Sequence, residues 1–227
     1  MKRTKTYLLL VISCTALLST SCSENDDVGA YFYEGVNYNK LTGLNAESTW
    51  LYDVRDDEVY PVVELGGKYW MAENLRHNVS GAMLNPSNSS KEYGYLYDWN
   101  TAKTACPTGW HLSSDADWKG IEEALGMATA DLSKLGGRLL VKLPSLKSQT
   151  GWKNSNNGSN GTLFSILPAG RYESNGFKNI EDYAFFWTST LNTGNESIGR
   201  YIFHSSEDIN RTHVDNSIGQ SCRCVLN

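Results

Sequence analysis

The chain has 227 residues with 20 Lys or Arg against 25 Asp or Glu, which gives a net charge of −5 at pH 7. This length suits one domain with additional segments, and 7 Trp and 13 Tyr provide ample apolar surface for a core. The acidic balance, without a cluster of basic residues beyond the first few positions, excludes nucleic acid as an expected partner.

Residues 1–22 are predicted to be a lipoprotein signal peptide. Lys2, Arg3 and Lys5 form a basic start, and the apolar stretch after them is too short to span a membrane comfortably. The stretch ends in LLSTSC, which resembles the cleavage box of bacterial lipoproteins, where the cysteine becomes the first mature residue and carries the lipid. Lipidation is therefore expected at Cys22, with Cys14 in VISC as the alternative.

Residues 23–49 are expected to form a polar tether between the lipid and the folded domain. Glu24, Asp26 and Asp27 lie close behind Cys22, and this resembles the acidic signal that sends lipoproteins of the Bacteroidota to the outer face of the outer membrane. A solvated linker without a routing role is the alternative interpretation. The prediction is an outer-membrane protein that faces outward and is held by its lipid rather than by charge.

A composition shift at Trp50 marks the start of a domain that is expected to span residues 50–227. Its first element, over 57–75, is a predicted β-hairpin that turns at Gly66-Gly67. A first helix is expected near 98–105.

The most regular pattern predicts a second helix, which follows CPTGWHL. Asp98 can cap the first helix, and Ser113 or Ser114 can cap the second. The second helix has a core-facing stripe with i, i+3 and i+7 spacing, made of Trp118, Ile121 and Leu125.

Strand and loop patterns dominate from Leu139 onward. Strands are expected over 163–171, 183–190, 199–206 and 221–227, and the segment 205–220 is expected to be rich in turns. Short helices followed by strands and long loops predict an α+β domain.

The patterns that could carry catalysis are weak. His111 lies five residues from Cys106, but a catalytic pair needs hydrogen-bond contact, which closeness in sequence does not supply, and a structural role is favoured. The remaining histidines lack metal-ligand spacing, so no catalytic residue, metal site or cofactor is predicted. Loop-bound calcium stays open at Glu207, Asp208 and Asp215, which fall in a predicted loop.

Three cysteines, Cys106, Cys222 and Cys224, follow the signal peptide and enter a compartment where disulfides form. Three cannot all pair, so one bridge and one spare thiol are expected. A soft-metal site is the alternative, because the two cysteines of the CRC sequence would face the same side of a strand.

Four sequence blocks in order carry a family resemblance. They are VYPVVELGGKYWMAENLRHN, YGYLYDWNTAKTACPTGWHLSSDADW, LPAGRYESNGF with YAFFWTSTLN, and RYIFHSSEDINR followed by GQSCRCVLN. Together they resemble the Fibrobacter succinogenes major paralogous domain of surface lipoproteins, over residues 50–227. The resemblance implies a C-type lectin-like fold with two short helices, small antiparallel sheets and long loops. It also implies a Cys106–Cys224 disulfide, which would leave Cys222 as the spare thiol.

The resemblance and the predicted location favour a non-catalytic, cell-surface binding or adhesion module for an unidentified glycan or protein. A structural subunit of a surface or fimbrial assembly is the alternative. A thiol- or metal-dependent enzyme of the formylglycine-generating type is less favoured, because it would need two free cysteines close together.

The expected ligand surface lies on the long loop GWKNSNNGSNG at 151–161, where aromatic and amide side chains could stack on a glycan and hydrogen-bond to it. Packing of the loop tryptophan against the core is an equal alternative. The candidate contact residues are Trp152, Asn154, Asn156, Asn157 and Asn160.

Overall fold

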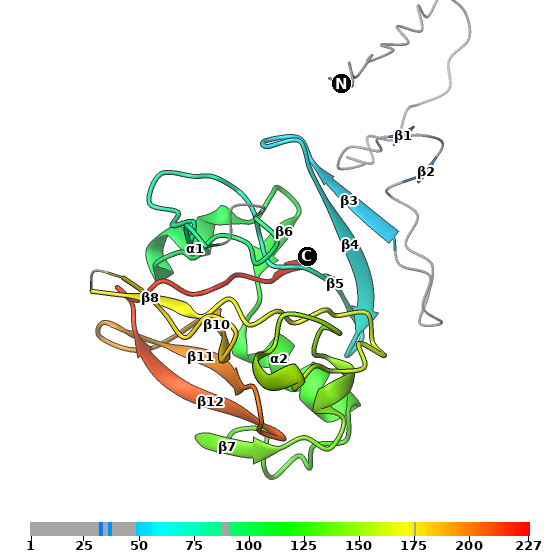
Figure 1. Ribbon diagram of the computed structural model, residues 1–227, viewed down its shortest axis with the longest axis vertical. Coiled ribbons are helices and arrows are strands. Elements are labelled where there is room, and N and C mark those ends of the chain that lie inside the picture. Colours follow the sequence, from blue (N-terminus) through cyan, green and yellow to red (C-terminus); the bar gives the residue numbers. More distant parts are fainter. Residues whose placement is uncertain (1–31, 34–35, 38–48, 88–90, 175) are drawn as a thin grey trace, which may run out of the picture.

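The computed structural model describes residues 32–33, 36–37, 49–87, 91–174 and 176–227 (Figure 1). The predicted signal peptide, the candidate lipidation sites Cys14 and Cys22, and most of the predicted tether lie outside these residues. In the tether, β1 (Phe32–Tyr33) pairs antiparallel with β2 (Val36–Asn37). Within the described part of the chain, no helix is both long enough and apolar enough to cross a membrane.

A five-stranded sheet joins the beginning and the end of the domain. In order, its strands are β3 (Thr49–Asp53), β4 (Glu58–Leu65), β5 (Lys68–Met71), β13 (Cys224–Leu226) and β6 (Trp110–Leu112), and neighbours are antiparallel. β4 and β5 form the predicted hairpin. At its turn Gly66 has a φ of 62°, and a Cβ there would lie 2.6 Å from the backbone of Gly120. Only glycine therefore lets this turn approach the helix that contains Gly120.

A four-stranded antiparallel sheet forms the other side of the domain. Its order is β10 (Tyr183–Thr193), β11 (Glu196–Phe203), β12 (Asp208–Asp215) and β7 (Gly136–Leu139). β10 and β11 confirm two of the predicted strands. A short hairpin of β8 (Arg171–Glu173) and β9 (Gly176–Lys178) lies alongside this sheet (Figure 1). Two 3-10 turns, η1 (Leu143–Ser145) and η2 (Lys153–Ser155), lie in the segment before β8.

Two strand predictions are wrong. The segment expected to be turn-rich holds β12. Its sequence, DINRTHVD, lacks the apolar alternation of a half-buried strand, because Arg211 faces the Asp115 carboxylate instead of an apolar core. Conversely, the strand expected over 163–171 is irregular up to Gly170, with isolated bridges at Ile166 and Gly170, and only its last residue belongs to a strand, β8. Pro168 in this segment has no N–H to donate to a ladder.

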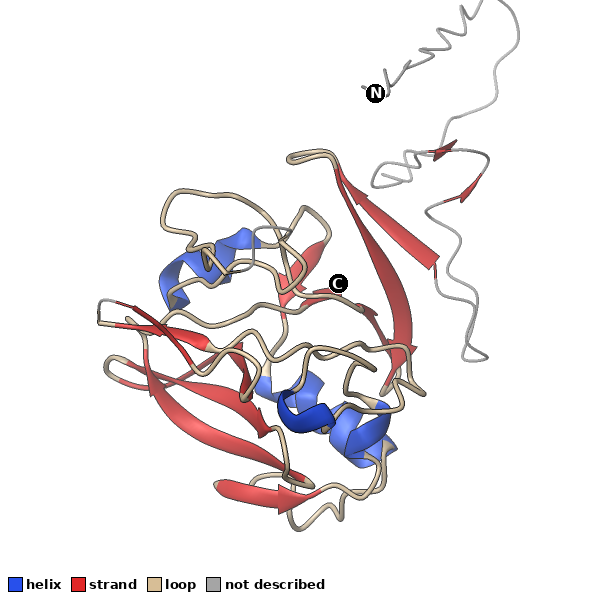
Figure 2. Ribbon diagram, viewed as in Figure 1, coloured by secondary structure: helices blue, strands red, loops and turns tan. Residues whose placement is uncertain are grey.

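Both predicted helices are present, and the fold class is α+β. α1 (Trp99–Ala105) begins after Asp98, whose side chain accepts a 2.8 Å hydrogen bond from the Thr101 N–H. α2 (Asp115–Ala124) begins after Ser114 and contacts both β4 and β10, so it lies between the two sheets (Figure 2).

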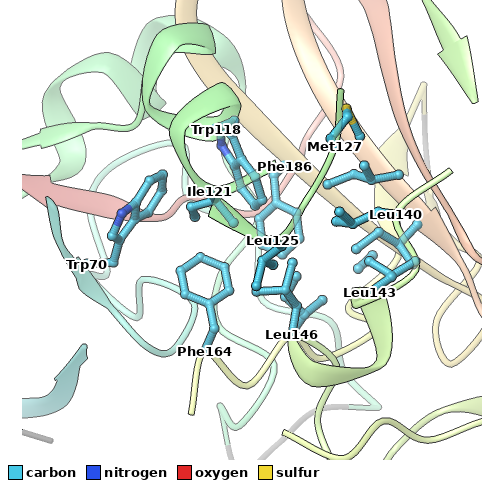
Figure 3. Packing of buried hydrophobic residues seen from close by; sticks show 14 of the residues in the cluster. Trp70, Trp118, Ile121, Leu125, Met127, Leu140, Leu143, Leu146, Phe164 and Phe186 are labelled. Atoms are coloured by element: carbon cyan, nitrogen blue, oxygen red, sulfur yellow. The ribbon is translucent and has the colours of Figure 1, made fainter. Parts of the chain in front are cut away.

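The aromatic residues pack into two clusters. The first surrounds α2, where Trp118 makes edge contacts with Trp70 and Phe164 at ring-centroid distances of 5.6 and 5.9 Å (Figure 3). The second lies between α1 and the end of the chain and includes Tyr60, Trp187 and the cysteines of the CRC sequence. These side chains bury most of the large apolar surface, which explains why a chain with long loops folds into one unit.

A capping box fixes the start of α2 and gives His111 a structural role. The Ser114 Oγ accepts a 3.1 Å hydrogen bond from the Asp117 N–H, and the Asp117 carboxylate accepts one of 2.7 Å from the Ser114 N–H. Lys68 Nζ lies 2.6 Å from the same carboxylate, and His111 Nε2 lies 3.2 Å from it. The other ring nitrogen of His111 lies 2.7 Å from Asn227 Oδ1, so the histidine links the helix start to the end of the chain.

We expect the stability of the protein to fall steeply between about pH 4 and pH 2, in part through Asp117. Burial raises the pKa of this carboxyl, but Lys68 and Ser114 together lower it to about 2. Because the folded pKa lies below the unfolded value, the stabilisation is present above about pH 4 and is lost as the pH falls through the folded pKa, an effect of about 2 kcal/mol. Urea unfolding at several pH values should show this slope, and Asp117→Asn should flatten it. An equal slope in the variant would contradict the assignment.

Candidate ligand-binding cavity

The cysteine and histidine of CPTGWHL do not form a catalytic pair. Cys106 is bonded to Cys224 with a Cα–Cα distance of 5.8 Å, which confirms the pairing implied by the resemblance. Cys222 is the free cysteine among those described, and burial raises the pKa of its thiol well above the usual range. A buried neutral thiol is a poor nucleophile and a poor metal ligand.

The tryptophan of the predicted ligand loop is part of the core. Only 4% of Trp152 is exposed, and its indole N–H lies 3.1 Å from both Ser148 Oγ and the Ile166 carbonyl oxygen. The ammonium group of Lys147 lies 4.2 Å from the centre of its ring. Of the two interpretations of Trp152, the structure supports packing and contradicts an exposed stacking surface.

The asparagines of the same loop hold the loop together. Asn157 accepts a hydrogen bond from the Trp152 N–H, Asn156 Nδ2 lies 2.8 Å from His204 Nδ1, and Asn160 bonds to Ser165 through both atoms of its amide. Asn154 is exposed. The residues that sequence reasoning assigned to ligand contact are therefore mostly engaged in shaping the loop.

The acidic residues considered for calcium are separated by the strand β12. Asp208 and Asp215 are its first and last residues, and seven steps along a strand cover about 23 Å. One ion cannot contact both, and the expectation that they share a loop is wrong. Among the described residues, no group of three His, Cys, Asp or Glu is arranged to hold a metal ion.

A cavity of about 560 Å³ lies on the face of the four-stranded sheet that points away from α2. Ala184 and Phe186 of β10 belong to the first cluster. Tyr183 and Phe185 alternate with them along the strand, so their side chains point to the opposite face of the sheet. Tyr201 of β11 lies directly across from Phe185. The cavity is bounded by this face of the sheet, by residues in and next to the β8–β9 hairpin, and by the segment that precedes β13.

Three aromatic rings form a continuous surface in the cavity, here called the aromatic platform: Tyr183, Phe185 and Tyr201. Tyr183 and Phe185 are stacked with centroids 5.3 Å apart, and Tyr201 lies 5.8 Å from Phe185 and 6.2 Å from Tyr183. Both tyrosines are partly exposed, whereas Phe185 is buried beneath the guanidinium of Arg171, which lies 4.7 Å from its ring. The platform therefore offers two tyrosine rings to a ligand.

The segment with Gln220 is threaded between β8 and β10. Gly219 exchanges two backbone hydrogen bonds with Tyr172 of β8, at 2.8 and 2.9 Å, and the Ser221 N–H donates to the Phe185 carbonyl at 3.1 Å. Gln220 lies between these two anchors and is fully buried. Its amide oxygen lies close to Gly199 of β11, since a Cβ at that position would be 3.5 Å from Gln220 Oε1.

Three buried polar atoms without a protein partner belong to residues beside this cavity. Within the described residues, neither Oε1 nor Nε2 of Gln220 has a hydrogen-bond partner, and Arg171 Nε has none either. Arg171 also forms an ion pair with Glu173, so its charge is compensated. A buried polar group left unpaired costs about 1–3 kcal/mol, so three such atoms at one cavity are unusual in a structural core.

Sequence reasoning missed this site because its residues come from separate segments. Arg171 precedes Tyr201 by 30 positions, and Gln220 follows Tyr201 by 19. The three residues meet only through the pairing of their strands. One available signal was the run YAFFW at 183–187, because aromatic residues at consecutive strand positions must occupy both faces of a sheet. An aromatic face that does not join the core is a candidate contact surface.

A family model described as the Fibrobacter succinogenes major domain matches residues 63–226. No curated protein and no solved structure matches the chain. The matched range covers most of the chain, including the helices, the disulfide and the whole four-stranded sheet. The chain therefore belongs to the Fibrobacter succinogenes major domain family.

Proposed function

We propose that the protein is a non-catalytic binding module, lipid-anchored through Cys22 on the outer face of the outer membrane, and that its ligand occupies the cavity beside the aromatic platform. One observation carries this proposal. The partly exposed rings of Tyr183 and Tyr201 line one cavity together with the charged side chain of Arg171. Aromatic surface with a few fixed polar groups is the usual composition of a binding site.

We also propose that the fold is a relative of the C-type lectin-like fold. Two helices, small antiparallel sheets and long connecting loops support this relation. The family membership is consistent with a surface protein. A fold alone does not assign a function, so the proposal for binding rests on the cavity and not on this relation.

The state of the cysteines supports a non-catalytic role. An enzyme of the formylglycine-generating type would need two accessible thiols, whereas Cys106 and Cys224 are bonded to each other and Cys222 is fully buried. An assembly subunit is the second candidate, and within the described residues no specific contact surface favours it over ligand binding.

Replacing Tyr201 with alanine is expected to weaken binding about tenfold, because an aromatic contact contributes about 1 kcal/mol beyond the area it buries. The mature lipoprotein would be screened against a glycan array and a panel of extracellular-matrix proteins. Asn154→Ala provides the matched control, since this exposed residue lies on the loop first expected to bind. Weaker binding in Asn154→Ala but not in Tyr201→Ala would place the ligand on the 151–161 loop instead of in the cavity. Absence of binding to every glycan and every matrix protein would count against the proposal.

A further inference from the structure

Strand β7 leaves one of its two sides without a hydrogen-bonding partner. It is the last strand of the four-stranded sheet, and among the described strands it pairs only with β12 (Figure 1). The Leu140 N–H donates to the Glu207 carbonyl oxygen at 3.0 Å, and antiparallel strands alternate between hydrogen-bonded and non-hydrogen-bonded residue pairs. The N–H and C=O groups of Gly137 and Leu139 therefore point away from β12, toward the outside of the sheet.

The residues in and beside β7 expose a group of apolar side chains. Seven large apolar side chains are exposed among the described residues, and three of them lie between positions 135 and 141. They are Leu135, which is 54% exposed, Leu139, which is 59% exposed, and Val141, which is 77% exposed. A single exposed apolar residue is ordinary, whereas several together mark a contact surface.

The usual protection of an exposed sheet edge is missing from β7. Natural edge strands carry lysine, proline or a bulge, which prevents pairing with another chain. The only charged residue of β7 is Arg138, which is 4% exposed and bonded to Glu122 in the core. Gly136 and Gly137 have no side chain that could keep another strand away. The outer side of β7 is therefore open to a further strand.

The sequence around β7 is complementary to a second copy of itself. A two-fold axis through residue 138 places Gly137 opposite Leu139 of the second copy, so the outward backbone groups of the two strands meet each other. The same register places Leu135 opposite Val141 of the second copy. Directly opposite and diagonal side chains contact each other across antiparallel strands, so the exposed apolar residues of both copies would cover one another.

The charges around the contact are compatible with this pairing. Arg138 is turned into the core, so no charged side chain of β7 would face the second copy. Lys142 would approach Lys134 of the second copy at each end of the contact, where Asp131 already compensates Lys134. A foreign strand would have to supply matching apolar positions, whereas a second copy has them, and a two-fold contact closes after two copies.

We infer that the protein forms a two-fold dimer through β7, in which the two four-stranded sheets join into one continuous antiparallel sheet. The axis is perpendicular to the sheet, so both aromatic platforms lie on the same face. With the cavity as the proposed ligand site, the dimer presents two sites in one direction and binds a repeated ligand more tightly than one copy does. The dimer does not depend on that proposal, because no residue that lines the cavity takes part in the pairing.

Sedimentation of the mature chain with Cys22→Ser, which removes the lipid and its thiol, tests the inference. Because the contact is short, we expect a dimer that dissociates on dilution from about 300 to about 1 µM. Leu139→Lys should raise the dissociation constant about tenfold or more, because it places a charge at the strand edge. Leu191→Lys is the matched control, since this leucine is 51% exposed and belongs to β10, at the other end of the sheet. Both variants should keep the melting temperature of the parent within about 2 °C, which separates lost association from lost folding.

Cysteine cross-linking tests the register independently. Leu135 faces Val141 of the second copy in the proposed dimer, so a mixture of Leu135→Cys and Val141→Cys proteins should form disulfide-linked dimers under mild oxidation. Either variant alone should form far fewer, because its two cysteines would lie about 20 Å apart. Cys222 is fully buried and adds no accessible thiol.

Three results would overturn the inference. The first is a chain that stays monomeric over the whole concentration range, and the second is a dimer that Leu139→Lys weakens no more than Leu191→Lys does. The third is cross-linking of either cysteine variant alone as efficiently as the mixture. A monomer that loses binding to a matrix protein through Leu139→Lys would assign the edge to a different protein, which also overturns the dimer.

Discussion

Loss of the Cys106–Cys224 disulfide is expected to lower the free energy of unfolding by about 4 kcal/mol. The bridge closes a loop of 118 residues, which is more than half of the chain. Closing so long a loop restricts the unfolded ensemble strongly, and a 100-residue loop corresponds to about 4.7 kcal/mol in the chain-entropy model. The bridge also fixes β13, which is only three residues long, beside β6 and the end of α1.

Urea unfolding of the oxidised protein, the reduced protein and Cys106→Ala/Cys224→Ala would measure this contribution. Reducing agent should destabilise the native protein and leave the double variant unchanged. Cys222→Ala is the matched control, because this cysteine is as fully buried as Cys224 but unbonded. It should cost only about 1 kcal/mol through lost packing. Peptide mapping without reduction that joins residues 106 and 222 would contradict the pairing.

The helices could be predicted from the sequence because their determinants are local. Asp98 and Ser114 cap the two helices with their own side chains, and Trp118, Ile121 and Leu125 face the core at helical spacing. The hairpin at Gly66-Gly67 was predictable for the same reason, since the turn residues and the flanking alternation are neighbours in the chain.

Strand β12 and the cavity could not be predicted, because their determinants are distant in sequence. Arg211 gains its place in β12 from Asp115, 96 residues earlier, and no apolar alternation marks the strand. Trp152 and Tyr201 show the same limitation for the site. Both are aromatic residues near polar neighbours, yet one is buried in the core and the other lines the cavity. The register of β10 and β11 places Tyr201 beside Phe185, whereas Trp152 is buried by loop contacts with Ser148 and Ile166.

The charged residues between α2 and the four-stranded sheet form a buried ion-pair network. Glu122 is fully buried, and its two carboxylate oxygens lie 2.7 and 2.8 Å from the guanidinium of Arg138. The Nε of Arg200 lies 2.7 Å from the same carboxylate. Asp115 at the start of α2 forms an ion pair with Arg200 and accepts hydrogen bonds from Arg211. The pKa of Asp115 is raised by burial but lowered further by these partners, so it lies well below its usual range.

Replacing Glu122 with glutamine is expected to lower the free energy of unfolding by about 3–5 kcal/mol. Glutamine keeps the shape of the side chain but leaves the Arg138 and Arg200 cations buried with less compensating charge. Removing one partner of a buried ion pair is more damaging than removing both, because the remaining charge has lost its water and its partner. Because the network is buried, added salt should restore little of the loss.

Urea unfolding of Glu122→Gln beside Glu123→Gln would test this expectation, since Glu123 is the next residue of α2 and is exposed. The control should change stability by less than about 0.5 kcal/mol. Adding Arg138→Met and Arg200→Met to Glu122→Gln should recover part of the stability, because the unpaired charges are then removed together with their partner. Equal effects at Glu122 and Glu123 would show that the network does not hold α2 against the sheet.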